Sequence, residues 1–331
     1  MEKQKKRKKH IFLKIFLILI LLFVIFIAVG NFLYDEYGEY DYFDEYYDDE
    51  YSDDGYYGYE DYDIEVPENT NLKVSDYALG TCGEMEGTTL LVSVFLNDSG
   101  SSWDNSASLK NDALKYTGMA TDWISKSTSS YGCNSKFLYN WNDYSDLYYE
   151  GTVDADMLDV ENNPDYVDVT AWRFIDENID SKALLEKYNA DNIGYMFYLN
   201  TPKSNKLTSC TRNFYEGMAY PYEMCFIYMF CEDEKEAPAG IAHEILHTFG
   251  APDLYRADTD GDNYGVSKIL VKELERTQSN DIMFTTYDAY TNKAYYDHIS
   301  NDFTDVDAYY VGIIDSCDFV TEWNLKPSQH R

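Results

Sequence analysis

Residues 11–33 constrain the fold of this chain more than any other segment. The run IFLKIFLILILLFVIFIAVGNFL is 23 residues long, carries one charged residue, Lys14, and has no polar face. A helix at the surface of a globular core keeps a polar stripe toward water, so this run does not suit such a core. Its length matches the roughly 20 residues that cross the hydrocarbon layer of a membrane. We therefore expect one transmembrane helix over 11–33.

The basic segment 1–10 (MEKQKKRKKH) sets the expected orientation of that helix. Lys and Arg beside a span favour the cytoplasmic side, so the rest of the chain should lie outside. The alternative is a cleaved signal peptide with an unusually long apolar region and Ala28-Val29-Gly30 as its cleavage site. We expect a single-pass membrane protein with an extracellular C-terminal domain, secreted if the N-terminal segment is cleaved.

Residues 34–71 are expected to form an acidic, tyrosine-rich tether. The stretch 34–63 contains 14 Asp or Glu and 11 Tyr, with no Lys or Arg. Like charges at this density repel one another, and few aliphatic residues are present to build a core. Binding of cations or basic partners to this tract stays open as an alternative.

The net charge of the chain excludes one class of partner. The total is −34; setting aside +6 on residues 1–33 and −14 on residues 34–63 leaves −26 on residues 64–331. A surface of this sign repels nucleic acid and anionic lipid headgroups. We expect no nucleic-acid partner, and contact with the membrane only through residues 11–33.

Residues 72–331 have the patterns of a folded domain. Stretches typical of strands alternate with helical spacing, which favours a mixed α/β sheet. Strands are expected at Thr88–Asn97, Lys136–Trp141, Val167–Phe174, Ile193–Leu199 and Glu223–Phe230. Helices are expected at Leu109–Ser125 and Ser181–Asn189, and the polar stretch Asn200–Asn213 is expected to form turns.

Six cysteines fall in this domain, and none belongs to a Cys-x-x-Cys pair, which argues against a structural zinc knuckle. In an exported domain an even number permits three disulfides, in any of fifteen pairings. Free buried thiols are the alternative.

The segment Ala239–Gly250 (AGIAHEILHTFG) carries the residues best suited to chemistry. Pro238 favours the first turn of a helix and the final glycine favours its end. His243 and His247, four apart, then share one face and can hold one metal ion. Zinc lowers the pKa of a bound water, whose proton Glu244 could take as general base. The alternative is an ordinary amphipathic helix with two surface histidines.

A catalytic zinc ion needs a third protein ligand, with a fourth position left open. Asp253 follows Gly250 by three residues, and a glycine bend could bring its carboxylate back to the ion. Other residues remain as alternative third ligands: Glu273, Glu275 and His298.

The full run His243-Glu-x-x-His247-x-x-Gly250-x-x-Asp253 resembles the long zinc motif of the metzincin clan of metallopeptidases. Asp at the last position resembles the snapalysin-like variant, and APDLY is similar to the turn of immune inhibitor A-type bacterial peptidases. The resemblance implies a metzincin-like mixed sheet with an active-site helix, a methionine turn and a C-terminal helix.

Further matches to the clan lie downstream of the zinc motif. The resemblance implies that Met283, in Ser279–Phe284, forms the methionine turn below the metal. A tyrosine often follows that turn closely, but here Tyr287 lies four residues on, which leaves its role as a transition-state donor open. Asp307–Ile314 is expected to be the final helix, packed beneath the site.

An acidic stretch, Asp258–Gly265, resembles a calcium-binding loop. It lacks the glycine and glutamate that the standard twelve-residue pattern requires. We keep a Ca²⁺ site beside the zinc ion and a solvated acidic loop as the two alternatives.

These expectations combine into a membrane-anchored extracellular zinc metalloendopeptidase that hydrolyses peptide or protein substrates. Its zinc ligands would be His243, His247 and Asp253, with Glu244 as general base. The alternatives are a non-catalytic peptidase-derived binding module at the cell surface, and a structural surface protein without a stoichiometric metal.

Overall fold

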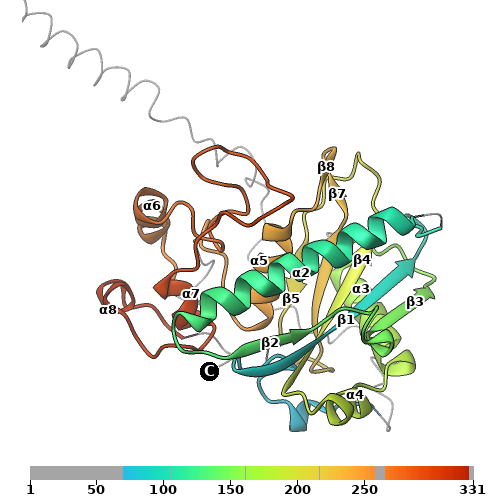
Figure 1. The fold of residues 1–331 in the computed structure, drawn as a ribbon. Helices are drawn as coiled ribbons and strands as arrows, with labels where there is room; N and C mark the ends of the chain where they lie inside the picture. The colour runs from blue at the N-terminus through green and yellow to red at the C-terminus, as the bar shows by residue number, and fades with distance from the viewer. Residues whose placement is uncertain (1–69, 105, 161, 216, 258–264, 328–331) are drawn as a thin grey trace, which may run out of the picture. The chain divides into compact units, whose positions relative to one another are not determined.

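A mixed six-stranded sheet is the centre of the computed structural model, which describes residues 70–104, 106–160, 162–215, 217–257 and 265–327. Strand β1 is the longest and pairs with β4 on one side and with β2 and then β3 on the other; all of these pairs are parallel. Beyond β4 follow β6, which is parallel, and β5, which is antiparallel (Figure 1). The strands are β1 (Gly87–Asn97), β2 (Ser135–Leu138), β3 (Tyr148–Thr152), β4 (Asn192–Leu199), β5 (Cys210–Arg212) and β6 (Glu223–Tyr228).

Both faces of the central strands are buried. In β1, Leu90, Val92 and Val94 enter one apolar core, whereas Leu91 and Phe95 enter the other. Successive side chains of a strand point to opposite faces, so a strand that is apolar at every position needs a covering layer on each side. This explains why the apolar runs are continuous rather than alternating.

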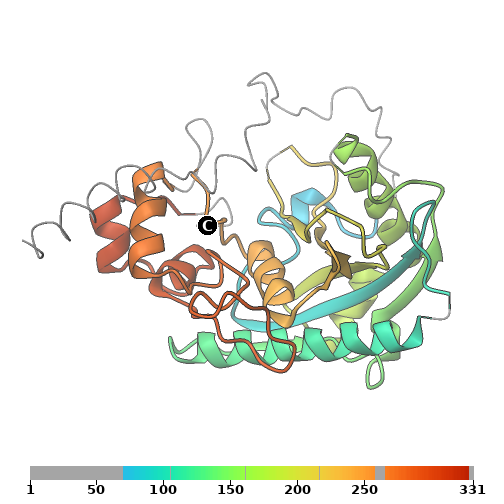
Figure 2. The ribbon, with the colours of Figure 1, turned by 90° about the horizontal axis from the view of Figure 1, so that it is seen from above.

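Seven α-helices supply those layers within the described residues. Helices α2 (Ala107–Ser129) and α5 (Pro238–Thr248) pack in the core on one face, and α3 (Pro164–Asn178) and α4 (Ser181–Tyr188) in the core on the other. The remaining helices, α6 (Lys268–Thr277), α7 (Asp305–Tyr310) and α8 (Asp318–Trp323), extend the core on the α5 side. They lie together on one side of α5, and the sheet lies on the other (Figures 1 and 2).

The predicted α/β class with a mixed sheet is confirmed, and most predicted elements correspond to observed ones. The strands predicted at Thr88–Asn97, Ile193–Leu199 and Glu223–Phe230 are β1, β4 and β6, and β2 begins within one residue of its predicted start. A short hairpin of β7 (Phe230–Cys231) and β8 (Glu234–Lys235) follows β6 and leads into α5.

The strand predicted at Val167–Phe174 is wrong, because this segment belongs to helix α3. Its valines and aromatic residues favour a strand, but Val167, Ala171 and Ile175 recur at helical spacing and are all buried. Pro164 occupies the first turn, where its missing N–H costs no hydrogen bond. Helical burial against the sheet therefore outweighs the local preference of the β-branched residues.

Other differences concern short elements. Strand β5 lies inside Asn200–Asn213, which was expected to form turns, and it exists through its pairing with β6. The helix predicted at Asp307–Ile314 is α7, which ends at Tyr310, and it is not the final helix because α8 follows. All six cysteines are free thiols, so the three disulfides that the composition permits are not formed.

Three expectations about the N-terminal part of the chain fall on residues that the structure does not describe: the basic segment 1–10, the span 11–33 and nearly all of the tether 34–71. Among the helices that are described, none has the length and apolar character needed to cross a membrane.

Candidate metal centre

Helix α5 presents His243 and His247 side by side. Pro238 stands at its start, and almost every residue of the helix is buried. The two histidines are one helical turn apart, and their Nε2 atoms lie 3.0 Å from each other. The rings meet edge to face, with centroids 4.5 Å apart. The helix thus places two nitrogen atoms at one point, as the four-residue spacing predicts.

A glycine turn at the end of α5 brings Asp253 to the same point. Gly250 has a φ of +91°, a backbone conformation that is strained for residues with a side chain. Its N–H donates to the carbonyl of His247 at 2.8 Å, and the Ala251 N–H donates to the carbonyl of Leu246 at 3.2 Å, the two bonds of a Schellman motif. Oδ1 of Asp253 consequently lies 3.2 Å from Nε2 of each histidine.

Backbone carbonyls orient both imidazole rings. Nδ1 of His243 contacts the carbonyl oxygen of Ile282 at 2.9 Å, and Nδ1 of His247 contacts that of Ala251 at 2.6 Å. Since a carbonyl oxygen only accepts hydrogen bonds, each Nδ1 is the donor. Nε2 of each neutral ring is then the atom with a free lone pair.

The three inward-facing atoms repel one another unless a cation lies between them. Oδ1 of Asp253 is buried and faces the two Nε2 atoms, each at 3.2 Å. Burial lowers the pKa of His243, but Asp253 and Glu244 overcome this and raise it to about 9. Burial raises the pKa of Asp253, yet the imidazoles of His247 and His243 hold it well below its usual value. Positive charge is therefore favoured at this point, as a proton or as a metal ion.

The donor set fits zinc. Ligands about 2.0–2.1 Å from a tetrahedral zinc ion lie about 3.3 Å from one another. The three separations here are 3.0, 3.2 and 3.2 Å. Two imidazoles and one carboxylate also leave a fourth position open, which is typical of catalytic rather than structural zinc.

Glu244, next to the first histidine, is held by an edge strand. The residue is 5% exposed, and the hydroxyl of Thr211 in β5 lies 2.8 Å from Oε2 and 2.8 Å from the backbone carbonyl oxygen of Glu244. The Thr211 contact was not predicted, because β5 itself was expected to be a turn. No local signal connects residues 33 positions apart.

A second carboxylate, Glu236, lies two residues before the start of α5 and was not predicted. It accepts hydrogen bonds from the Ser209 hydroxyl and from the N–H of Ala237. Burial raises its pKa to about 7, and the charge of Glu244 acts in the same direction.

Hydrogen bonds connect the segment around Met283 to His243 and to the residue after Asp253. Met283 is fully buried, and its carbonyl accepts the N–H of Leu254, directly after Asp253. The carbonyl of Ile282 accepts from His243. Tyr287 instead donates its hydroxyl to Glu234 in β8. The backbone at Ile282 and Met283 therefore contacts His243 and the residue after Asp253, whereas Tyr287 is engaged with the hairpin; the methionine turn itself stays a prediction.

The alternative third ligands lie elsewhere. Glu273 forms an ion pair with Arg276, Glu275 is exposed on α6, and His298 pairs with Asp297. Among the described residues, the triad of His243, His247 and Asp253 is the one group of three or more such side chains close enough to share an ion. Residues 258–264 of the possible calcium loop lie outside the part of the chain that the structure describes.

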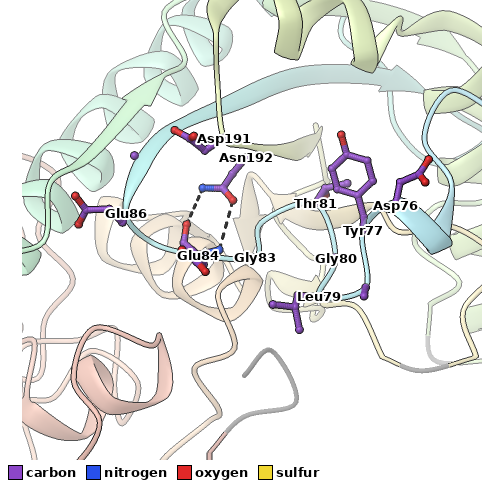
Figure 3. A pocket seen from close by; sticks show the side chains of 12 residues that line it. Asp76, Tyr77, Leu79, Gly80, Thr81, Gly83, Glu84, Glu86, Asp191 and Asn192 are labelled. Atoms are coloured by element: carbon purple, nitrogen blue, oxygen red, sulfur yellow. Dashed lines mark hydrogen bonds between the residues drawn. The ribbon is translucent and has the colours of Figure 1, made fainter.

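A cavity of about 450 Å³ lies away from the triad, at the first residues of β1 and β4 (Figure 3). Two of its acidic residues are engaged with backbone: Asp191 accepts from the N–H of Thr88, and Glu86 accepts from that of Asn134. The amide of Asn192 donates to the carbonyl of Glu84. None of the residues that line the cavity belongs to the triad of the candidate metal centre.

Searches of protein-family models and of curated proteins gave no match to this chain. The resemblance to metzincins thus stays a prediction from the sequence motif.

Proposed function

We propose that this protein is a zinc-dependent peptidase, with His243, His247 and Asp253 as zinc ligands. One observation carries the proposal: three electron-pair donors, each largely buried, lie 3.0–3.2 Å apart with their free lone pairs toward one point. Such an arrangement is costly without a cation. The open fourth position favours a catalytic over a structural ion.

In this proposal Glu244 is the general base. A bound zinc ion would supply Lewis acidity and lower the pKa of a water molecule in the open position. Glu244 adjoins the ligand His243 in the chain, and Thr211 restrains its carboxylate. The carboxylate would take the proton of the attacking water and deliver it to the departing amine of the peptide.

We also propose that residues 11–33 anchor the protein in a membrane, with the peptidase domain outside and residues 34–71 as its tether. The support is the apolar sequence, the basic segment before it and the acidic segment after it. Substrates would then be extracellular peptides or proteins.

Metal analysis and one substitution test the peptidase. The full-length protein should contain one zinc ion per chain and lose peptide cleavage on treatment with a chelator. Glu244→Ala should keep its zinc and cleave about 100- to 10,000-fold more slowly, since it removes a general base. Glu275→Ala, at an exposed position of α6, is the matched control and should cleave like the parent.

Two outcomes would replace the proposal. A zinc-loaded parent that cleaves no member of a broad peptide library would favour the non-catalytic binding module. A Glu244→Ala protein as active as the parent would show that this carboxylate is not the base.

A further inference from the structure

The three proposed ligands differ in how the protein orients them. His243 and His247 are each fixed through Nδ1 by a backbone carbonyl. Asp253 is fixed by a side chain, the guanidinium of Arg256. A backbone contact survives most substitutions, whereas this one depends on the identity of a single residue.

The two oxygens of Asp253 have separate partners. Oδ1 faces both imidazoles, and Oδ2 lies 3.0 Å from Nη2 of Arg256. The Asp253 side chain is 12% exposed and that of Arg256 is 69% exposed. Arg256 thus approaches the carboxylate from the solvent side, three residues further along the chain, and its guanidinium lies 6.0 Å from the ring centroid of Tyr255.

We infer that Arg256 is a positioning residue that engages Oδ2, so that Asp253 offers only Oδ1 to the metal ion. This inference rests on the proposed function, because it requires that the triad binds a metal. A carboxylate can bind a metal through one oxygen or through both. With Oδ2 held by the guanidinium, the one-oxygen mode leaves four-coordinate geometry and the open position intact.

The charge of Arg256 and its contact with Asp253 predict opposite effects of its removal on zinc affinity. A guanidinium near the site repels a divalent cation, so removal of its charge should tighten zinc binding. If Arg256 acts by orienting Asp253, its removal should weaken binding, because the free carboxylate must then be ordered by the metal. The sign of the change in affinity therefore separates the two roles.

The experiment compares the full-length parent with Arg256→Ala, Arg256→Lys and the control Arg276→Ala. Arg276 also pairs with a carboxylate three residues away, Glu273, and is 71% exposed, but it lies outside the triad. Zinc affinity is measured by competition with a chromophoric chelator. Coordination is followed by the visible absorption of the cobalt(II)-substituted proteins, which is strong for four ligands and weaker for five.

Arg256→Ala should bind zinc about 10- to 100-fold more weakly, as substitutions of groups that orient metal ligands do. Its cobalt absorption should weaken as Oδ2 joins the coordination. Arg256→Lys should recover part of the affinity, since an ammonium can donate to Oδ2 but lacks the planar fork. Arg276→Ala should match the parent in both measurements.

Equal or tighter zinc binding by Arg256→Ala, or a cobalt spectrum identical to that of the parent, overturns the inference while the proposed function stands. A parent that binds no stoichiometric zinc or cobalt overturns the proposed function and the inference with it. Arg256 is highly exposed, so its substitution should leave folding intact, and Arg256→Lys provides a second variant that retains the charge.

Discussion

Two buried aspartates, each paired with an arginine, lie in different parts of the molecule. Asp168 in α3 binds Nε of Arg212 at 2.9 Å, and Asp253 beyond α5 binds Nη2 of Arg256 at 3.0 Å. Their side chains are 6% and 12% exposed. By burial and by partner, the two carboxylates look alike.

Their pKa values nevertheless move in opposite directions. Burial raises the pKa of Asp168 to about 6, although Arg212 acts to lower it. Burial acts on Asp253 in the same way, but the imidazoles of His247 and His243 hold its pKa well below the usual value. One guanidinium does not offset burial, whereas a cluster of imidazoles reverses it. Asp168 is therefore part of a structural ion pair, and Asp253 belongs to a site built for positive charge.

Replacing each aspartate by asparagine should give the largest contrast. Asp253→Asn removes the proposed anionic zinc ligand. Its zinc affinity should fall by more than about 100-fold, because substitutions that only orient metal ligands already lower the affinity by up to about 100-fold. Asp168→Asn should keep one zinc per chain. Elemental analysis after dialysis against a weak chelator measures both. If Asp253→Asn kept its zinc, Asp253 would be no more involved in metal binding than Asp168.

The second largest contrast between the Asp168–Arg212 and Asp253–Arg256 pairs should be in the pH dependence of stability. Asp168 has a folded pKa of about 6, above the roughly 3.9 of an unfolded aspartate, so the folded state holds more protons between these values. Stability from this group therefore falls as pH rises from about 4 to 6, by up to about 3 kcal/mol. Urea unfolding of parent and Asp168→Asn across this range should show the decline in the parent and a shallower one in the variant.

In the metal-free protein, Asp253 should make stability depend on pH in the opposite direction. Its folded pKa lies below the unfolded value, so its contribution is present above about pH 4 and is lost as pH falls further. If the free energy of unfolding of the parent and of Asp168→Asn changed identically between about pH 4 and 6, Asp168 would not be the source of the decline described above.

The smallest expected effect concerns how each aspartate is placed. Asp168 sits in a regular helix, whereas Asp253 depends on the left-handed turn at Gly250. Gly250→Ala should lower the free energy of unfolding by about 1–2 kcal/mol and also weaken zinc binding. Gly132→Ala is the matched control, because Gly132 also has a positive φ of +83° and open space around it. It should lose similar stability and keep the parent's zinc affinity, as measured by urea unfolding and chelator competition.

Much of the candidate site could be predicted because its spacing is local. The four-residue spacing from His243 to His247 is about one helical turn, and Gly250 sets the turn that follows. Local patterns failed at α3, where β-branched residues suggested a strand that burial against the sheet converted into a helix. They also failed at β5, whose three residues form a strand through their pairing with β6.

The sequence by itself determined the apolar strands at the centre of the sheet, the histidine pair on α5 and the glycine that returns the chain toward it. These depend on preferences and periodicities that act within a few residues. Only the tertiary structure decided that Thr211 holds Glu244, that the carbonyl of Ile282 orients His243, and that Glu273 and His298 lie outside the cluster. Such contacts join residues far apart in the chain, and packing rather than local preference determines where they meet.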